Sequence, residues 1–188
     1  MGLFRIKDLE FEIVEATFKA HISEGLRWSI RIKAEYPNGR IQGSEWSPLA
    51  YSEDLFQIGG TVLNRWSDIL GQSIEWGDGY DEKRGEYFGS LCVFEHLDIY
   101  QSKLVLGPLI SPSSFAIDWA AQCDVCFDDD YGKGLALTIQ TGVEFEGIEV
   151  PYQDERESLA ALRKHIREGE FAFDPGDGRH YKPIFRPL

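Results

Sequence analysis

The chain has 188 residues, of which 43% are hydrophobic and 13% aromatic, so it can bury a substantial core and is not disordered throughout. Its 19 Lys and Arg against 32 Asp and Glu give a net charge of −13, which argues against nucleic acid, itself strongly negative, as a partner. No apolar run approaches the roughly 20 residues of a membrane-spanning helix, and the first apolar stretch contains acidic residues, unlike a signal peptide. We expect a single cytoplasmic domain over residues 1–188 that has no contact with a membrane.

Apolar and charged residues alternate along much of the chain, and this period of two predicts strands. The alternation starts at residues 4–13 and returns at residues 28–36, where Trp28 and every second residue after it form an apolar face. The second strand is expected to end in a tight turn, because Asn38-Gly39 supplies the positive φ that such turns need.

The middle of the chain predicts further strands. Residues 87–110 are apolar on both faces, which is typical of one or two central strands, and Gly107-Pro108 is expected to end them. The longest alternation runs from Phe115 to Phe127 and places seven apolar residues on one face. A last alternating run, residues 135–150, changes phase at Gly147, which predicts a bulge or a bend.

Two segments change to the helical period of 3.6 residues. The first covers about residues 53–70, although Gly59-Gly60 weakens it, and the second covers about residues 155–168 after a capping pattern at Asp154. From about residue 170 the chain is expected to be an irregular tail. We therefore predict a mostly β (α+β) fold: an antiparallel β-sandwich or strongly bent sheet with two helices on an edge or face.

The three cysteines, Cys92, Cys123 and Cys126, are an odd number and too few for a disulfide scaffold. Cys123 and Cys126 form one CxxC pair, whereas a structural zinc site usually needs two such pairs. On a strand, residues three apart point to opposite faces, so these thiols are expected to pack rather than bind a metal. No metal or cofactor is expected.

The negative charge is concentrated in residues 41–154, which hold five basic and twenty acidic residues, a net charge of −15. A patch of this kind can attract and orient a cationic partner, with Tyr and Trp side chains as buried anchors. The alternative is that the acidic residues only keep the protein soluble and form turns. The predicted partner-binding residues are Trp76, Asp78, Tyr80, Asp81, Glu82, Asp128, Asp129, Asp130 and Tyr131; Tyr87 lies nearby, and Glu144, Glu146 and Glu149 form a further acidic cluster.

Calcium and carbohydrate are alternative ligands. Asp128, Asp129 and Asp130 could contribute to a calcium loop, but residues 76–82 lack the spacing of an EF-hand. Stacking on sugar rings would require exposed tryptophans, and only Trp46 and Trp76 are expected in loops.

An enzyme is a further alternative, centred on His96 and Asp98. If this segment is a strand, the two side chains share a face and can interact, whereas Glu95 points the other way. The chain contains no GxSxG, HExxH or P-loop motif that would supply a recognisable nucleophile, metal or phosphate site.

These features favour a non-enzymatic cytoplasmic protein that occludes a basic protein partner. The most economical role is an immunity or antitoxin-type inhibitor of a toxin such as a nuclease, an analogy based on size, charge and missing catalytic motifs. A β-sandwich module for calcium or carbohydrate, and an enzyme built on His96 and Asp98, are the alternatives. The leading hypothesis requires the acidic segments to gather in one surface patch.

Overall fold

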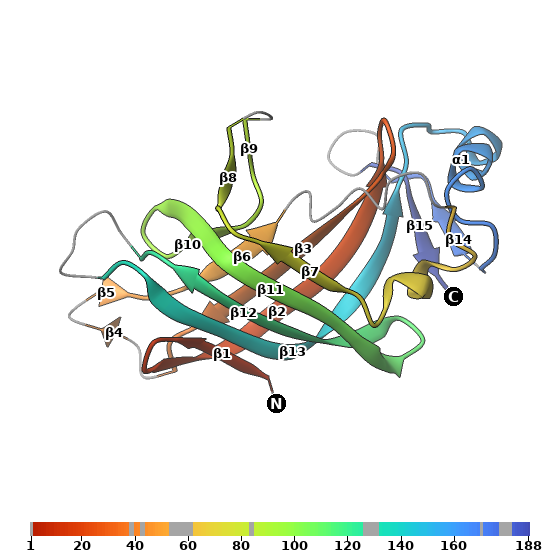
Figure 1. Ribbon diagram of the computed structural model, residues 1–188. Coiled ribbons are helices and arrows are strands. Elements are labelled where there is room, and N and C mark those ends of the chain that lie inside the picture. Colours follow the sequence, from red (N-terminus) through yellow and green to blue (C-terminus); the bar gives the residue numbers. More distant parts are fainter. Residues whose placement is uncertain are drawn as a thin grey trace.

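The computed structural model describes residues 2–37, 40–41, 44–52, 62–82, 85–125, 132–169, 171–176 and 182–188 (Figure 1). Eight strands form a closed barrel in which each strand is antiparallel to the next. The last strand pairs antiparallel with the first and closes the barrel. The eight strands are β1 (Leu3–Ile6), β2 (Leu9–Ile22), β3 (Leu26–Glu35), β6 (Leu49–Ser52), β10 (Ser90–Cys92), β11 (His96–Ser111), β12 (Ser114–Cys123) and β13 (Leu135–Glu149).

The predicted sandwich or open bent sheet with two helices is therefore wrong. The barrel closes because β13 pairs with β1, with Phe4 opposite Ile139. The second half of β13 also runs parallel to β2, with Phe145 opposite Phe18. Closure removes the free edges that an open sheet would expose.

Apolar side chains fill the barrel, as expected for eight strands, whose interior is just wide enough for side chains. The predicted face of β3 is confirmed, because Trp28, Ile30 and Ile32 are buried. The largest fully buried side chains are Trp28, Trp119, Phe4, Phe18, Phe115 and Phe145.

Three extra strands extend the barrel. The strand β7 (Ser73–Trp76) pairs with β11. The strand β15 (Ile184–Pro187) pairs with β13, and β14 (Phe171–Asp174) pairs with β15, so the segment after residue 170 is not simply an irregular tail. Two short hairpins complete the strands: β4 (Arg40–Ile41) with β5 (Ser44–Glu45), and β8 (Tyr80–Asp81) with β9 (Glu86–Tyr87).

The prediction of a helix over residues 53–70 is wrong where the structure describes it. Residues 53–61 lie outside the described part of the chain, and the rest contains only a short 3-10 helix, η1 (Trp66–Ile69). The helical stripe correctly marked Trp66 and Ile69 as buried. However, Leu63 forms a bridge with Ile166, which takes the backbone before η1 into an extended conformation.

The second predicted helix exists but is shorter than expected. The helix α1 (Glu155–Leu162) begins where the capping pattern placed it, since the carboxylate of Asp154 accepts a hydrogen bond from the Glu157 N–H at 2.9 Å. It ends before residue 168 because the Arg167 N–H donates to the Leu63 carbonyl instead of continuing the helix. In the described part of the chain no helix is long and apolar enough to cross a membrane.

Two predicted strand irregularities have different outcomes. The phase change at Gly147 is confirmed as a bulge, since the pairing of β13 with β2 shifts register between Phe145 and Gly147. Gly107-Pro108 does not end a strand: β11 continues to Ser111 and only shifts its register to β12 there. The predicted turn at Asn38-Gly39 lies outside the described residues.

Candidate functional site

A hairpin stands out from the barrel between β7 and β10 and contains the short strands β8 and β9 (Figure 1). Its base is tied to β11 by backbone hydrogen bonds: the Gln101 N–H donates to the Gly77 carbonyl at 2.7 Å, and the Ile99 N–H to Gly89 at 2.9 Å. Within the hairpin the Phe88 N–H donates to the Gly79 carbonyl at 2.9 Å. The barrel therefore holds the base while the strands beyond it project outward.

The hairpin carries an exposed pair of tyrosines. Tyr80 and Tyr87 are opposite each other in the pairing of β8 with β9, and their ring centroids lie 4.8 Å apart. Their side chains are 39% and 55% exposed, which is high for two aromatic rings in contact. The predicted residues Asp78 and Glu82 are exposed on the same hairpin, so the structure brings aromatic and acidic side chains together on one protruding element.

Trp76 supports this hairpin from below. Its indole N–H donates to the Ile99 carbonyl at 2.9 Å, and its ring lies edge-on to Trp119 at 6.0 Å. The side chain is half-buried, and these two contacts attach the base of the hairpin to the barrel.

Asp98 lies directly beneath the hairpin on the outer face of β11. The approach is so close that a Cβ on Gly79 would lie 2.9 Å from the Asp98 Cγ, which explains the glycine. Burial raises the pKa of the Asp98 carboxyl above its usual value, and the nearby Asp124 carboxylate raises it further. Both effects disfavour the charged form, whereas a cation brought to this surface would favour it.

Asp124 is held in place by two donors. The Tyr100 hydroxyl donates to its Oδ1 at 2.9 Å, and the Gly134 N–H donates to the same atom at 2.8 Å. Burial raises the pKa of Tyr100, and its hydrogen bond to Asp124 adds to this, so the hydroxyl keeps its proton and remains a donor. Tyr100 was not predicted as a site residue, although its position two residues after Asp98 places both on one face of a strand.

The raised pKa of the Asp98 carboxyl leads to a prediction about stability. A carboxyl whose pKa is higher in the folded than in the unfolded state destabilises the fold increasingly as the pH rises from the unfolded pKa to the folded pKa, and fully above the folded pKa. We expect Asp98→Asn to raise the melting temperature relative to the unsubstituted protein at pH 7, and the difference to shrink towards pH 4. Thermal unfolding at a series of pH values measures this, with Glu95→Gln as a control that removes one exposed charge. A constant difference across the series would contradict the prediction.

His96 and Asp98 share the outer face of β11, as predicted, but they are not brought together as a catalytic pair. The Nδ1 atom of His96 lies 2.9 Å from the Tyr51 hydroxyl, and the histidine is exposed. Asp98 is covered by Gly79 instead. Within the described part of the chain, no hydrogen bond or ion pair joins His96 to Asp98.

The predicted acidic patch is divided. Residues 126–131, which include the predicted Asp128, Asp129, Asp130 and Tyr131, lie outside the described part of the chain, and of Asp81 only the backbone is described. Glu144 accepts a hydrogen bond from Ser113 at 2.6 Å, at the turn that follows β11. That turn is about ten residues along β11 from the hairpin base, or roughly 30 Å. Glu149, the last residue of β13, forms an ion pair with Lys19 of β2 at 2.8 Å, so neither Glu144 nor Glu149 is paired within the hairpin.

The calcium loop predicted at Asp128, Asp129 and Asp130 lies outside the described residues, and the carbohydrate alternative loses one of its two tryptophans. No group of three or more His, Cys, Asp or Glu side chains in that part of the chain could hold a metal ion. Trp46, expected in a loop, is only 5% exposed and stacks on Phe11 with a centroid distance of 6.2 Å. The tryptophans expected to be available to a sugar are therefore reduced to the half-buried Trp76.

The described half of the CxxC pair is a core residue. Cys123 is fully buried, and burial, followed by the nearby Asp124, raises the pKa of its thiol to about 12. Cys92 lies on β10 and is partly exposed, whereas Cys126 is outside the described residues.

This contrast predicts different thiol reactivity. Only the thiolate reacts readily, so Cys123 is expected to resist iodoacetamide at pH 8 in the native protein, whereas Cys92 is alkylated. Peptide mass spectrometry reads both sites, and the same treatment in concentrated urea is the control in which Cys123 becomes labelled. Labelling of Cys123 as fast as Cys92 in the native protein would contradict its burial.

No family model, curated protein or solved structure matches this chain. A function can therefore be inferred only from the chemistry of the hairpin and of the residues beneath it. The relevant side chains are Asp78, Tyr80, Glu82, Tyr87, Asp98 and Asp124, called the hairpin surface below.

Proposed function

We propose that this protein binds a basic protein partner through the hairpin surface and blocks that partner by occlusion, without catalysis. The observation that carries the proposal is the exposed Tyr80–Tyr87 pair, which stands beside exposed carboxylates on an element that projects from the barrel. Tyrosines are frequent energetic hot spots of protein interfaces, and carboxylates around them select a cationic partner.

The carboxylates at the base of the hairpin add to this support. Burial is the larger cause of the raised pKa of Asp98, and repulsion by the Asp124 carboxylate adds to it. A lysine or arginine of a partner placed between them would relieve the repulsion, because an opposite charge favours the ionised form of both carboxyls. The net charge of −13 would also accelerate the encounter with a basic protein.

The biological role that we propose is that of an immunity or antitoxin-type inhibitor, with a toxin such as a nuclease as the partner. The cleft of a nuclease is cationic because it binds phosphate, so a protruding acidic hairpin can enter it and exclude the substrate. We place this activity in the cytoplasm, and the free thiols of Cys92 and Cys123 are compatible with its reducing environment.

A comparative pull-down tests the proposal. The tagged full chain and the double variant Tyr80→Ala/Tyr87→Ala are incubated with lysate of the native host, and the retained proteins are identified by mass spectrometry. We expect the unsubstituted chain to retain a basic protein that the double variant loses. The control is Tyr152→Ala, which removes a tyrosine that is 46% exposed outside the hairpin.

Dissociation constants measured with the purified chain and the purified partner then give the size of the effect. Loss of hot-spot tyrosines is expected to weaken the affinity by about 30-fold or more. The dissociation constant of the unsubstituted chain is expected to rise between low and high salt, because exposed charges are screened. The proposal would be overturned if only neutral or acidic proteins were retained, or if the double variant retained the same basic protein equally well. It would also be overturned if the dissociation constant did not change with salt concentration.

A further inference from the structure

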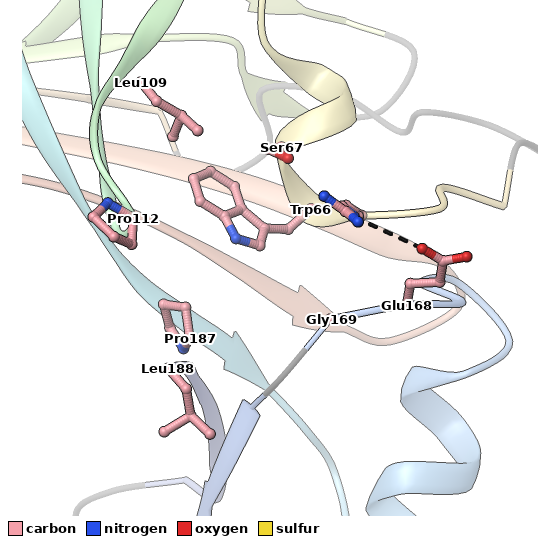
Figure 2. Close-up of a pocket in the computed structure, with 9 residues that line it drawn as sticks. Trp66, Ser67, Leu109, Pro112, Glu168, Gly169, Pro187 and Leu188 are labelled. Carbon is pink, nitrogen blue, oxygen red and sulfur yellow. Dashed lines mark ion pairs between the residues drawn. The ribbon is translucent and has the colours of Figure 1, made fainter.

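A second concave site lies away from the hairpin, at the end of the barrel where η1 meets the turn between β11 and β12 (Figure 2). It is a pocket with a volume of about 450 Å³, within the range of sites that take drug-sized molecules. Four elements contribute to it: η1, the end of β11, the end of β15 and the segment that follows α1.

One side of the pocket is apolar and firmly supported. Trp66 is only 8% exposed, and its ring stacks on Phe145 with a centroid distance of 4.3 Å, so the indole is fixed against the core. Leu109 lies on the same side and is 49% exposed, which leaves an apolar surface open to a ligand. Pro112 and Pro187 continue this wall, as Figure 2 shows.

The other side carries one pair of opposite charges. The Nε of Arg65 lies 3.7 Å from an Oε of Glu168, and the two side chains are 68% and 64% exposed. A pair this exposed and this long is weak, so Glu168 can accept a hydrogen bond from another cation at little cost.

The backbone that carries this carboxylate is nevertheless held in place. The Glu168 N–H donates to the Asn64 carbonyl at 2.7 Å, and the preceding Arg167 N–H donates to Leu63 at 2.9 Å. The segment after α1 is therefore bonded to the segment before η1, and Glu168 is held at the edge of the pocket opposite the apolar wall (Figure 2).

We propose that this pocket binds an amphipathic organic amine, with its apolar body against Trp66 and Leu109 and its ammonium group on Glu168. Arg65 and Glu168 are the ionisable side chains that line the pocket, and their charges cancel. The field of the whole molecule, with its net charge of −13, then decides the sign of the ligand and favours a cation. An anionic ligand on Arg65 would have to enter against that field.

Three probes that share a phenylpropyl body and differ in the charge of the head group separate the contribution of charge from that of apolar contact. They are 3-phenylpropylamine, 3-phenylpropanol and 3-phenylpropanoate. Titration of the full chain at pH 7, followed by ligand-observed NMR, is expected to rank the amine first, the alcohol second and the carboxylate last. The amine is expected to bind about tenfold more tightly than the carboxylate, the effect of roughly one favourable charge contact. Equal affinities, a tighter carboxylate, or no saturable binding of the amine would overturn the proposal.

Two pairs of variants locate the binding. Glu168→Gln is expected to remove the preference for the amine over the alcohol, whereas Glu95→Gln, which changes the net charge equally at a distant exposed position, is expected to keep it. Leu109→Ala is expected to weaken all three probes by a similar factor. Its control is Ile110→Ala, because Ile110 is 63% exposed but does not line the pocket. If Glu168→Gln leaves the preference unchanged, or both leucine and isoleucine variants behave alike, the ligand does not occupy this pocket.

Discussion

Replacing Trp119 by alanine is expected to lower the free energy of unfolding by about 3–5 kcal/mol, the usual cost of removing a large aromatic side chain from a core. Trp119 is fully buried inside the barrel, on β12. Its indole N–H donates to the Ser102 hydroxyl at 2.7 Å, and its ring contacts Trp76. The substitution would create a cavity, remove the partner of a buried hydroxyl and loosen the base of the hairpin.

Urea unfolding followed by circular dichroism measures this loss. The control is Trp119→Phe, which keeps most of the apolar volume but leaves Ser102 without its donor, and should cost about 1–3 kcal/mol. We also expect Trp119→Ala to weaken partner binding, because Trp76 and Ile99 anchor the hairpin against this region. If the alanine variant unfolds at the same urea concentration as the unsubstituted protein, this account of the barrel core is wrong.

Replacing Gly147 by alanine is expected to cost about 2–3 kcal/mol or more, although it adds only one methyl group. Gly147 has a φ of +133°, a conformation that L-residues rarely adopt. An added Cβ would lie 3.0 Å from the carbonyl carbon of Phe185 and closer still to its oxygen. Because the obstacle is the backbone of β15, no side-chain rotation can relieve it.

The substitution is also expected to destabilise the pairing of β13 with β15 locally, in addition to lowering the free energy of unfolding. The Val150 N–H donates to the Pro183 carbonyl at 2.9 Å, just beyond the pairing of β13 with β15. Hydrogen exchange of the Val150 amide is therefore expected to accelerate in Gly147→Ala more than exchange in β2 or β3. The matched control is Gly25→Ala, since a Cβ there meets no atom within 4 Å. If the two substitutions have equal effects, the close contact between an added Cβ at position 147 and the Phe185 carbonyl does not cause the loss of stability.

The strands were the most predictable part of this fold. The alternation from Phe115 identified β12 and its buried face, and the phase change at Gly147 identified the bulge in β13. The helical stripe at Trp66 was misleading, because η1 buries the same residues with only one turn. An apolar period shows which side chains must leave water, but a short segment can satisfy that need in more than one conformation.

The candidate site was partly predictable. Asp78, Tyr80 and Glu82 lie in a local hairpin, so their proximity follows from chain order. The acidic pair beneath them does not: Asp98 lies on β11 and Asp124 directly follows β12, and their proximity depends on the pairing of Ile99 with Cys123. Two carboxylates of β13, Glu149 and Glu144, are instead paired with Lys19 and Ser113 elsewhere on the barrel.

The amino-acid sequence by itself determined which residues alternate between core and solvent, where Asp154 begins a helix and where the backbone of β13 must bulge. These are local properties, because side-chain direction and backbone freedom depend on a residue and its near neighbours. Only the tertiary structure decided that the sheet closes into a barrel and that Glu144 and Glu149 pair with residues outside the hairpin. Both depend on register between strands distant in the chain, such as Phe4 opposite Ile139, and the pattern within each strand does not specify its partner.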